Sequence, residues 1–458
     1  MKILLIGANI ASTPYPVYPL GLSMVSSALR SAGHEVYHFD FLQSDMSLEV
    51  LTREIGRIDP EIIGISIRNI DNVNLLNEQR YIDTVKDIVK NIRQQTSVPV
   101  VLGGSGFSMM PEAILREVGA DYGIVGEGES LMLGFVSDAA RGVYPSERCI
   151  RNPSGLHGRD IPSAYYDPGF MEFYLRNGSI APIQTKRGCT HKCVYCSYPF
   201  LEGATIRSRE PGAVVDDILF LTENLKVRYI FFIDSVFNDE EGHYLDVVRE
   251  MENQNIHVPW TAFFKPGKIT EENVALMKKT GLKAVEIGAD ASTDTTLRRL
   301  GKSFGFRDII EFNELFVRHD IATAHFYMFG GPGETQETVM EGIENIRNLK
   351  NTVSFMFMGI RILPHTALAR IAIREGIISP DQELLKPVYY ISPSVDKEWL
   401  EETLVNGFSG IRHCVFPPDA LESSLKFLHK LGYAGSMWDL LIPGRGKRNR
   451  RGKLGIRN

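Results

Sequence analysis

The chain has 458 residues and a formal charge of −6 at pH 7, so no net positive charge draws it to nucleic acid or to an anionic membrane. Hydrophobic residues make up 43% and charged residues 23%, the ordinary balance of a folded protein with buried cores. Five cysteines argue against a disulfide framework and suit a reducing cytoplasm. The apolar start MKILLIGANI is too short for a signal peptide, and no apolar run reaches the roughly 18 residues of a membrane span.

Residues 1–141 alternate between short apolar runs and amphipathic helical patterns. The runs KILLIG, EVYHFDF, IIGISI, VPVVLGG and DYGIVGEG are typical of strands. This alternation predicts a parallel sheet with helices on both faces. In such a sheet ligands bind at the carboxyl ends of the strands. Glycine-rich or polar loops follow the strands there, at 7–12, 66–74, 103–108 and 126–129.

Residues 142–179 are rich in Pro, Gly and Ser, which predicts a linker. The strand–helix alternation then resumes over 180–380 with APIQTKR, YIFFID, WTAFFKP, KAVEIGAD, TAHFYMFG and VSFMFMGIRI. Six such units predict a partial (β/α)6 barrel, with an open doubly wound sheet as the competing arrangement. Residues 381–458 are expected to form a small, mainly helical region with a basic tail.

Three cysteines in the stretch KRGCTHKCVYCSYP are the strongest chemical signal. Cys189, Cys193 and Cys196 form C-x3-C-x2-C directly after a predicted strand, a spacing that lets three thiolates meet at one soft metal centre. A structural zinc site normally needs four protein ligands. An iron–sulfur cluster held by three cysteines leaves one iron open. A zinc loop closed by a distant histidine and three unliganded thiols are the alternatives on spacing alone.

The motif resembles that of the radical S-adenosylmethionine (SAM) superfamily, whose three cysteines hold a 4Fe–4S cluster while SAM chelates the fourth iron and is cleaved to a 5′-deoxyadenosyl radical. FFIDSVFN, VEIGADASTDTTLRRLGK, MFGGPGET and GIRILPHTAL resemble further segments of this family in the expected order. The chain departs from it in having GADAS where GxESG is common, and His365 where glycine is usual. The resemblance implies SAM contacts from Tyr195, Asp234, Ser235, Glu286, Asp290, Gly330, Gly331 and Arg361.

The N-terminal part resembles the cobalamin-binding domain that precedes the barrel in one class of this superfamily. The similarity rests on its P-x-GL opening and its GEGE ending. It implies a Rossmann-like, flavodoxin-like fold and cobalamin contacts from Asn9, Ser12, Arg68, Asn69, Asp71, Asn72, Ser105 and Glu127. The D-x-H-x-x-G motif that supplies a histidine ligand to cobalt is absent. A sheet domain that holds another ligand is the alternative.

For function, the resemblance implies methylation of an unactivated carbon of a small molecule, with an electron donor such as flavodoxin or ferredoxin. Oxidative cyclisation, ring contraction or another radical rearrangement is the alternative. Methylthiotransferases need three further cysteines, and only Cys149 precedes the cluster motif. Cys414 is a speculative catalytic thiol. A non-catalytic nucleic-acid-binding protein would use the basic tail, with Arg445, Lys447, Arg448, Arg450, Arg451, Lys453 and Arg457.

Overall fold

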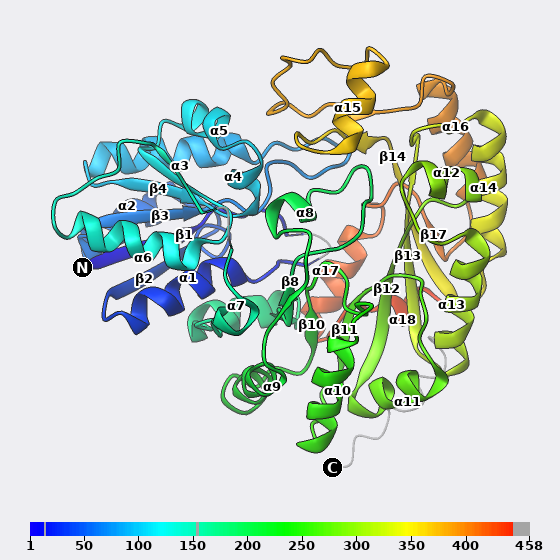
Figure 1. The fold of residues 1–458 in the computed structure, drawn as a ribbon, viewed down its shortest axis with the longest axis horizontal. Helices are drawn as coiled ribbons and strands as arrows, with labels where there is room; N and C mark the ends of the chain where they lie inside the picture. The colour runs from blue at the N-terminus through cyan, green and yellow to red at the C-terminus, as the bar shows by residue number, and fades with distance from the viewer. Residues whose placement is uncertain (13–14, 153–154, 443–458) are drawn as a thin grey trace.

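The structure is a computed structural model and describes residues 1–12, 15–152 and 155–442 (Figure 1). All seven basic residues of the tail, from Arg445 to Arg457, lie outside the described residues. Two parallel sheets dominate the molecule, one in each half of the view, and helices cover them (Figure 1).

The N-terminal sheet has the strand order β2-β1-β3-β4-β5-β6, with every pair parallel. Its strands are β1 (Lys2–Gly7), β2 (Glu35–Asp40), β3 (Ile62–Ser66), β4 (Val100–Gly103), β5 (Tyr122–Val125) and β6 (Cys149–Arg151). The helices are α1 (Leu20–Ser31), α2 (Leu48–Ile58), α3 (Ile82–Gln95), α4 (Ser105–Met109), α5 (Pro111–Val118) and α6 (Gly128–Ala139). Helix α1 packs beside α6, and α3 packs beside α2 and α5. The order 2-1-3-4-5 is that of flavodoxin-like folds, which confirms the predicted fold class.

The range 142–179, expected to be a linker, contains regular structure. Strand β6 pairs with β5 and extends the first sheet, and it is followed by the short helix η1 (Gly158–Asp160) and by α7 (Pro168–Asn177). The sequence pattern does not reveal β6, because three residues at a sheet edge are too few for a period to show. Helix α7 begins at Pro168. The preceding residue, Asp167, caps the helix because its side chain accepts a hydrogen bond from the Phe170 backbone N–H.

The second sheet forms the partial barrel, with the strand order β17-β14-β13-β12-β11-β10-β7. Its six predicted strands are β7 (Ala181–Ile183), β10 (Ile230–Phe232), β11 (Trp260–Phe264), β12 (Leu282–Asp290), β13 (Ala322–Phe329) and β14 (Thr352–Met358). The covering helices are α9 (Pro211–Leu219) with the π-helical turn η2 (Phe220–Asn224), α10 (His243–Asn253), α11 (Glu271–Thr280), α12 (Asp294–Arg299), α13 (Phe306–Arg318) and α14 (Gln336–Asn348). Each described strand is parallel to its neighbours, and β7 does not pair with β17, so the barrel stays open.

Two short hairpins and the C-terminal region complete the fold. Strand β8 (Lys186–Arg187) pairs with β9 (Arg207–Ser208) around the cysteine loop and α8 (Tyr198–Leu201), and β15 (Ile360–Arg361) pairs with β16 (Tyr389–Tyr390). The C-terminal helices are α15 (Ala367–Arg374), α16 (Lys397–Phe408), α17 (Glu422–Lys430) and α18 (Trp438–Leu441). Strand β17 (Cys414–Val415) adds a seventh strand to the barrel, which the sequence pattern did not predict.

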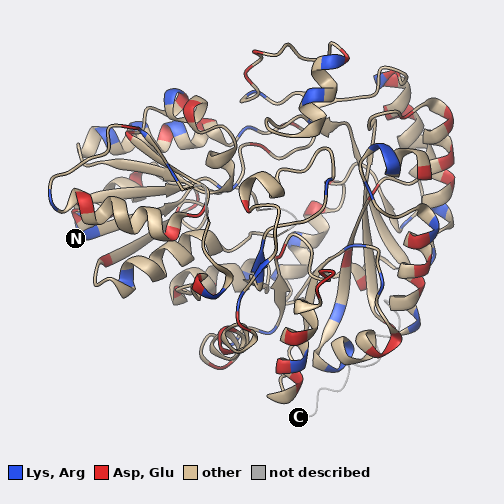
Figure 2. Ribbon diagram, in the orientation of Figure 1, with Lys and Arg blue, Asp and Glu red and all other residues tan. Residues whose placement is uncertain are grey.

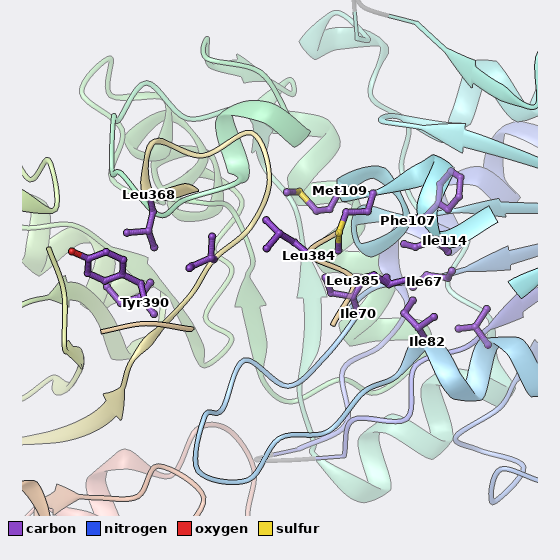
Figure 3. Packing of buried hydrophobic residues seen from close by; sticks show 14 of the residues in the cluster. Ile67, Ile70, Ile82, Phe107, Met109, Ile114, Leu368, Leu384, Leu385 and Tyr390 are labelled. Atoms are coloured by element: carbon purple, nitrogen blue, oxygen red, sulfur yellow. The ribbon is translucent and has the colours of Figure 1, made fainter. Parts of the chain in front are cut away.

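One hydrophobic core cluster extends across both domains. Figure 3 shows Met109 and Ile70 of the N-terminal domain packed against Leu384 and Leu385 of the segment that follows the barrel. All four side chains are at least 90% buried. Apolar contacts of this kind fix the position of one domain relative to the other, so the loops of both sheets face a common space.

Charged residues lie mainly on the outer helices, and few lie on the strands of the two sheets (Figure 2). In β8 both residues, Lys186 and Arg187, are charged and buried. Buried charges of this kind require partners, and these partners belong to the site described below. Among the described residues, no helix combines the length and apolar character that crossing a membrane requires.

Candidate active site

A cavity of about 910 Å³ lies between the carboxyl-end loops of the N-terminal sheet and the interior of the barrel. The N-terminal domain lines it with the loops after β1, β3, β4 and β5, where the sequence predicted a ligand. The barrel contributes side chains of β10, β11, β12, β13 and β14, and α18 contributes Trp438. Both domains therefore face one chamber, as a reaction between two bound cofactors requires.

The cysteine loop lies at the edge of this cavity. Arg187 before the loop and Ser197 and Tyr198 after it line the cavity. Gly188 allows the tight start of the loop: its φ is +93°, and a Cβ there would lie 1.9 Å from the Thr205 carbonyl oxygen. Side chains are excluded at this position, so the glycine before the first cysteine has a local steric reason.

The three thiols lie close enough to influence one another. Burial raises the pKa of Cys189, and it raises that of Cys196 to about 12, with a further contribution from Cys193 in both cases. Thiols of this kind bind metal with release of protons. Cysteine thiolates are the donors that hold iron–sulfur clusters, whereas a structural zinc site normally has four protein ligands. The three thiols of the loop therefore fit a cluster that leaves one iron open.

Tyr195 of the cysteine loop forms one hydrogen-bonded group with Asp290 and Lys302. The Tyr195 hydroxyl donates to Asp290 Oδ2 at 2.5 Å, and Lys302 Nζ pairs with the same oxygen and lies 3.2 Å from the hydroxyl. Burial lowers the pKa of Lys302, but Asp290 and Cys193 outweigh this and raise it, so the ammonium is retained. Asp290 follows a bulge in β12 and has φ +64°, which turns its side chain towards the cysteine loop.

The predicted glycine turn is closed by its own glutamate. The backbone N–H groups of Gly330 and Gly331 both donate to Glu334 Oε2. Burial raises the pKa of Glu334 to about 7, against the lowering effect of these two hydrogen bonds. Gly330 has φ +91°, which confirms that the turn needs glycine at this position.

His365, which replaces the usual glycine in the sixth-strand motif, adopts the left-handed conformation at φ +65°. Its ring stacks on Phe200 of α8, with the centroids 4.2 Å apart. The departure from the family pattern therefore keeps the glycine-like backbone and adds a contact to the segment that follows the cysteines.

Three of the residues predicted to contact SAM form hydrogen bonds to other residues of the chain. Asp234 is 1% exposed and accepts hydrogen bonds from Thr185 and from the Lys186 backbone N–H. Ser235 donates to the Gly188 carbonyl oxygen at 3.0 Å. Arg361 is buried and does not line the cavity; its Nε donates to Asp71 Oδ2 at 2.8 Å, and its other nitrogens donate to backbone carbonyls. Asp71, predicted to contact cobalamin, is thus the partner of Arg361 across the domain interface.

Most of the other residues predicted to contact cobalamin form hydrogen bonds within the loops at this edge of the sheet. Asn9 bonds to Ala11, Asn72 accepts from Gln79, and Ser105 donates to the Arg68 carbonyl oxygen at 2.9 Å. Ser12 is half-buried outside the cavity lining. Arg68 and Asn69 line the cavity, and their side chains have no hydrogen-bonding partner within the described part of the chain. These two side chains are therefore available to a ligand.

Glu127 forms part of a buried ion network between the domains. Its carboxylate pairs with Arg207 and, at 3.1 Å, with Arg187, while Arg187 Nη2 donates to Glu129 Oε1 at 2.5 Å. Arg187 Nε also donates to Gln184 Oε1 at 3.0 Å. The GEGE segment after β5 is thereby tied to the residue that precedes the cysteine loop, an arrangement that sequence spacing could not reveal.

Glu286 lies deep in the barrel rather than beside the cysteine loop. It is 4% exposed, lines the cavity and accepts a hydrogen bond from Trp438 Nε1 at 3.2 Å. Burial raises its pKa from 4.5 to about 7, against a small lowering by Trp438. The position agrees with a contact to a bound molecule inside the barrel.

This shift predicts a pH dependence of stability. Because the folded state holds the Glu286 proton more tightly than the unfolded state, the free energy of unfolding should fall as pH rises from 5 to 7 and stay lower above that, by up to about 3 kcal/mol. Glu286→Gln should lose the part of this dependence that Glu286 supplies, while the part due to Glu334 remains, and should be more stable than the parent at pH 8. Urea denaturation at pH 5 and pH 8 measures it, with the exposed Glu314→Gln as control. Equal pH dependence in parent and Glu286→Gln would contradict the assignment.

Cys414 lies in β17, is 7% exposed and does not line the cavity. Burial raises the pKa of its thiol to about 12. The speculative catalytic assignment gains no support from this placement.

Comparisons with known proteins agree with this architecture. Residues 6–136 match the family model of the B12 binding domain, and residues 183–362 match that of the Radical SAM superfamily. The chain carries a B12 binding domain followed by a radical SAM domain. Both parts of the predicted family assignment are confirmed.

Relatives share most of the chain at low identity. Tryptophan 2-C-methyltransferase of Streptomyces laurentii is 25% identical, over 78% of this chain and 72% of the relative. Anaerobic magnesium-protoporphyrin IX monomethyl ester cyclase of Rubrivivax gelatinosus is 23% identical, over 75% and 63%. The solved structure of TsrM from Kitasatospora setae, a radical SAM methyltransferase with tryptophan and a SAM analogue bound, has a TM-score of 0.85 at 22% identity and covers 98% of this chain and 99% of TsrM. This likeness confirms the fold of both domains and their arrangement.

Proposed function

We propose that the protein is a cobalamin-dependent radical SAM methyltransferase that transfers a methyl group to a carbon of a small molecule. The observation that carries the proposal is the single cavity that joins the strand-end loops of the B12 binding domain to the edge of the cysteine loop. Two relatives that act by methylation, tryptophan 2-C-methyltransferase and TsrM, support it.

The donor groups fit the three cofactors. Cys189, Cys193 and Cys196 would hold a 4Fe–4S cluster, which supplies the electron that cleaves SAM reductively. Tyr195 of the loop, Asp290 and Lys302 offer a hydroxyl, a carboxylate and an ammonium to the polar groups of SAM. The loops after β1, β3, β4 and β5 would hold cobalamin, with Arg68 and Asn69 free to bind its amides or phosphate.

Buried ion pairs fix the two domains relative to each other. The ion network of Glu127, Glu129 and Arg187 ties the cobalamin loop to the start of the cysteine loop. The Asp71–Arg361 pair ties the loop after β3 to β15 of the barrel domain. Because both connections are buried, the two cofactors would keep a constant separation during the reaction. A soluble electron donor of the flavodoxin or ferredoxin type would supply the electron, and a cytoplasmic location fits the oxygen sensitivity of such a centre.

Product analysis tests the proposal. The chain is reconstituted anaerobically with iron, sulfide and cobalamin and then given SAM and dithionite. We expect both 5′-deoxyadenosine and S-adenosylhomocysteine, the second only when cobalamin is present. 5′-Deoxyadenosine without S-adenosylhomocysteine would overturn methylation in favour of another radical reaction, and the absence of both would overturn the enzyme assignment.

Non-methylating radical chemistry is the second candidate, supported by the likeness to the magnesium-protoporphyrin IX monomethyl ester cyclase. In that case cobalamin would be bound and consumption of SAM would yield 5′-deoxyadenosine alone.

A further inference from the structure

The barrel end of the cavity combines one carboxylate with an aromatic wall. Glu286 stands on β12 directly beside Phe263 of β11, because the two residues are register partners in the parallel pair. On the other side Phe326 of β13 and Phe355 of β14 are also register partners. Rings line this end of the cavity: Tyr15, Phe231, Phe263, Phe326, Phe355, Phe357 and Trp438.

Five of these rings pack in two groups, one formed by Phe231 and Phe263 and the other by Phe326, Phe355 and Trp438. The centroids of Phe231 and Phe263 are 4.9 Å apart, and those of Phe355 and Trp438 are 5.0 Å apart. Phe326 stacks on Phe355 at 5.5 Å. An apolar wall of this kind binds a flat ring system by burial and by ring–ring contact.

The carboxylate inside this wall is incompletely satisfied. Its one hydrogen bond within the described part of the chain comes from Trp438 Nε1 to Oε1, so Oε2 has no donor there. No described Lys, Arg or His forms an ion pair with Glu286, in contrast to Asp71, Glu127 and Glu129 in the same molecule. A buried carboxylate without a cation is costly, so a ligand that brings one would gain from the pairing.

The aromatic rings of the lining also favour a positively charged ligand. A cation close to Phe or Trp faces is attracted by the negative potential of the rings, whereas an anion is repelled. The unpaired carboxylate and the aromatic wall therefore both favour a positive group at the barrel end of the cavity.

We propose that the barrel end of the cavity binds an arylalkylamine, with the protonated amine on Glu286 and the ring system against Phe263, Phe326 and Phe355. This inference rests on the proposed function, because it assigns a substrate class to the same cavity. Glu286 is then a specificity-determining residue that contacts the substrate, rather than the SAM contact implied by the sequence motif.

Three indoles of similar size distinguish the effect of ligand charge on affinity from the effect of ligand shape. Tryptamine is cationic, tryptophol carries a neutral hydroxyl in place of the amine, and indole-3-propionate is anionic. Their affinities are measured by titration calorimetry at pH 8 with the cluster- and cobalamin-loaded chain in the absence of SAM, so that no turnover occurs. We expect tryptamine to bind at least about tenfold more tightly than tryptophol, and indole-3-propionate to bind most weakly.

Two variants test which residues produce the selectivity for the amine. Glu286→Gln keeps the shape and the Trp438 contact but removes the charge, so it should bring tryptamine to the affinity of tryptophol. Phe263→Leu should weaken all three ligands and leave their order unchanged. Unaltered visible absorption of the cluster and cobalamin, together with circular dichroism, shows that each variant is folded.

Equal affinity for tryptamine and tryptophol in the parent chain would overturn the proposal, as would selectivity retained in Glu286→Gln or binding of none of the three indoles. The product analysis that tests the proposed function contains no indole. Its result therefore shows whether the proposed function fails, independently of whether the indoles bind.

Discussion

Replacement of Cys189, Cys193 or Cys196 by alanine is expected to abolish both iron binding and SAM cleavage. Each change removes one of the three thiolates, and the two that remain are too few to hold a cluster. Iron and sulfide content after anaerobic reconstitution, together with 5′-deoxyadenosine formation, measures the result. Both quantities should fall to the level of a control without protein.

Cys149→Ala is the matched control. Cys149 lies in β6, at the edge of the first sheet, and is not part of the cysteine loop. Its loss should leave iron content and SAM cleavage unchanged. An intact cluster in the variant that lacks all three loop cysteines would refute the assignment, whatever the similarity of the fold.

Arg187→Met is expected to lower the apparent free energy of unfolding by about 3–5 kcal/mol. Arg187 is 6% exposed and is paired with Glu129 and Glu127, so the variant leaves the buried Glu129 without a cation and Glu127 with Arg207 alone. Burial lowers the pKa of Arg187, but Glu129 and Glu127 outweigh that effect and raise it, which identifies the pairing as the compensating interaction. Urea denaturation followed by fluorescence measures the loss.

Arg176→Met provides the comparison. Arg176 pairs with Glu172 one helical turn away on α7, and the two side chains are 75% and 63% exposed. An exposed pair of this kind contributes at most about 1 kcal/mol. Similar losses in Arg187→Met and Arg176→Met would show that the buried network does not hold the domains together. Adding Glu129→Gln to Arg187→Met should recover part of the loss, because it removes the carboxylate that has lost its cation.

The strands of both sheets could be predicted because each one is a run of buried apolar residues bounded by polar loops. KILLIG and VSFMFMGIRI, for example, become β1 and the β14–β15 segment. Strands β6 and β17 were missed because they have three and two residues and take their stability from the neighbouring strand. The family motifs located the cysteine loop and the glycine turn, since these depend on local spacing.

The partners of the predicted polar residues could not be read from spacing. Asp71 and Arg361 are 290 positions apart, and Glu286 and Trp438 are 152 apart, yet each pair is in contact. A strand-end carboxylate such as Asp234 fits a cofactor contact in sequence, but its oxygens are taken by Thr185 and Lys186. Sequence patterns place a residue at an edge of a sheet, whereas the packing of the two domains decides what it faces.

The account depends on an iron–sulfur cluster with one iron left open to SAM. Electron paramagnetic resonance of the dithionite-reduced, reconstituted chain tests this directly. The account predicts the signal of a reduced 4Fe–4S cluster, with g-values that change when SAM is added. A signal that SAM leaves unchanged, or zinc in place of iron in the loaded protein, would contradict it.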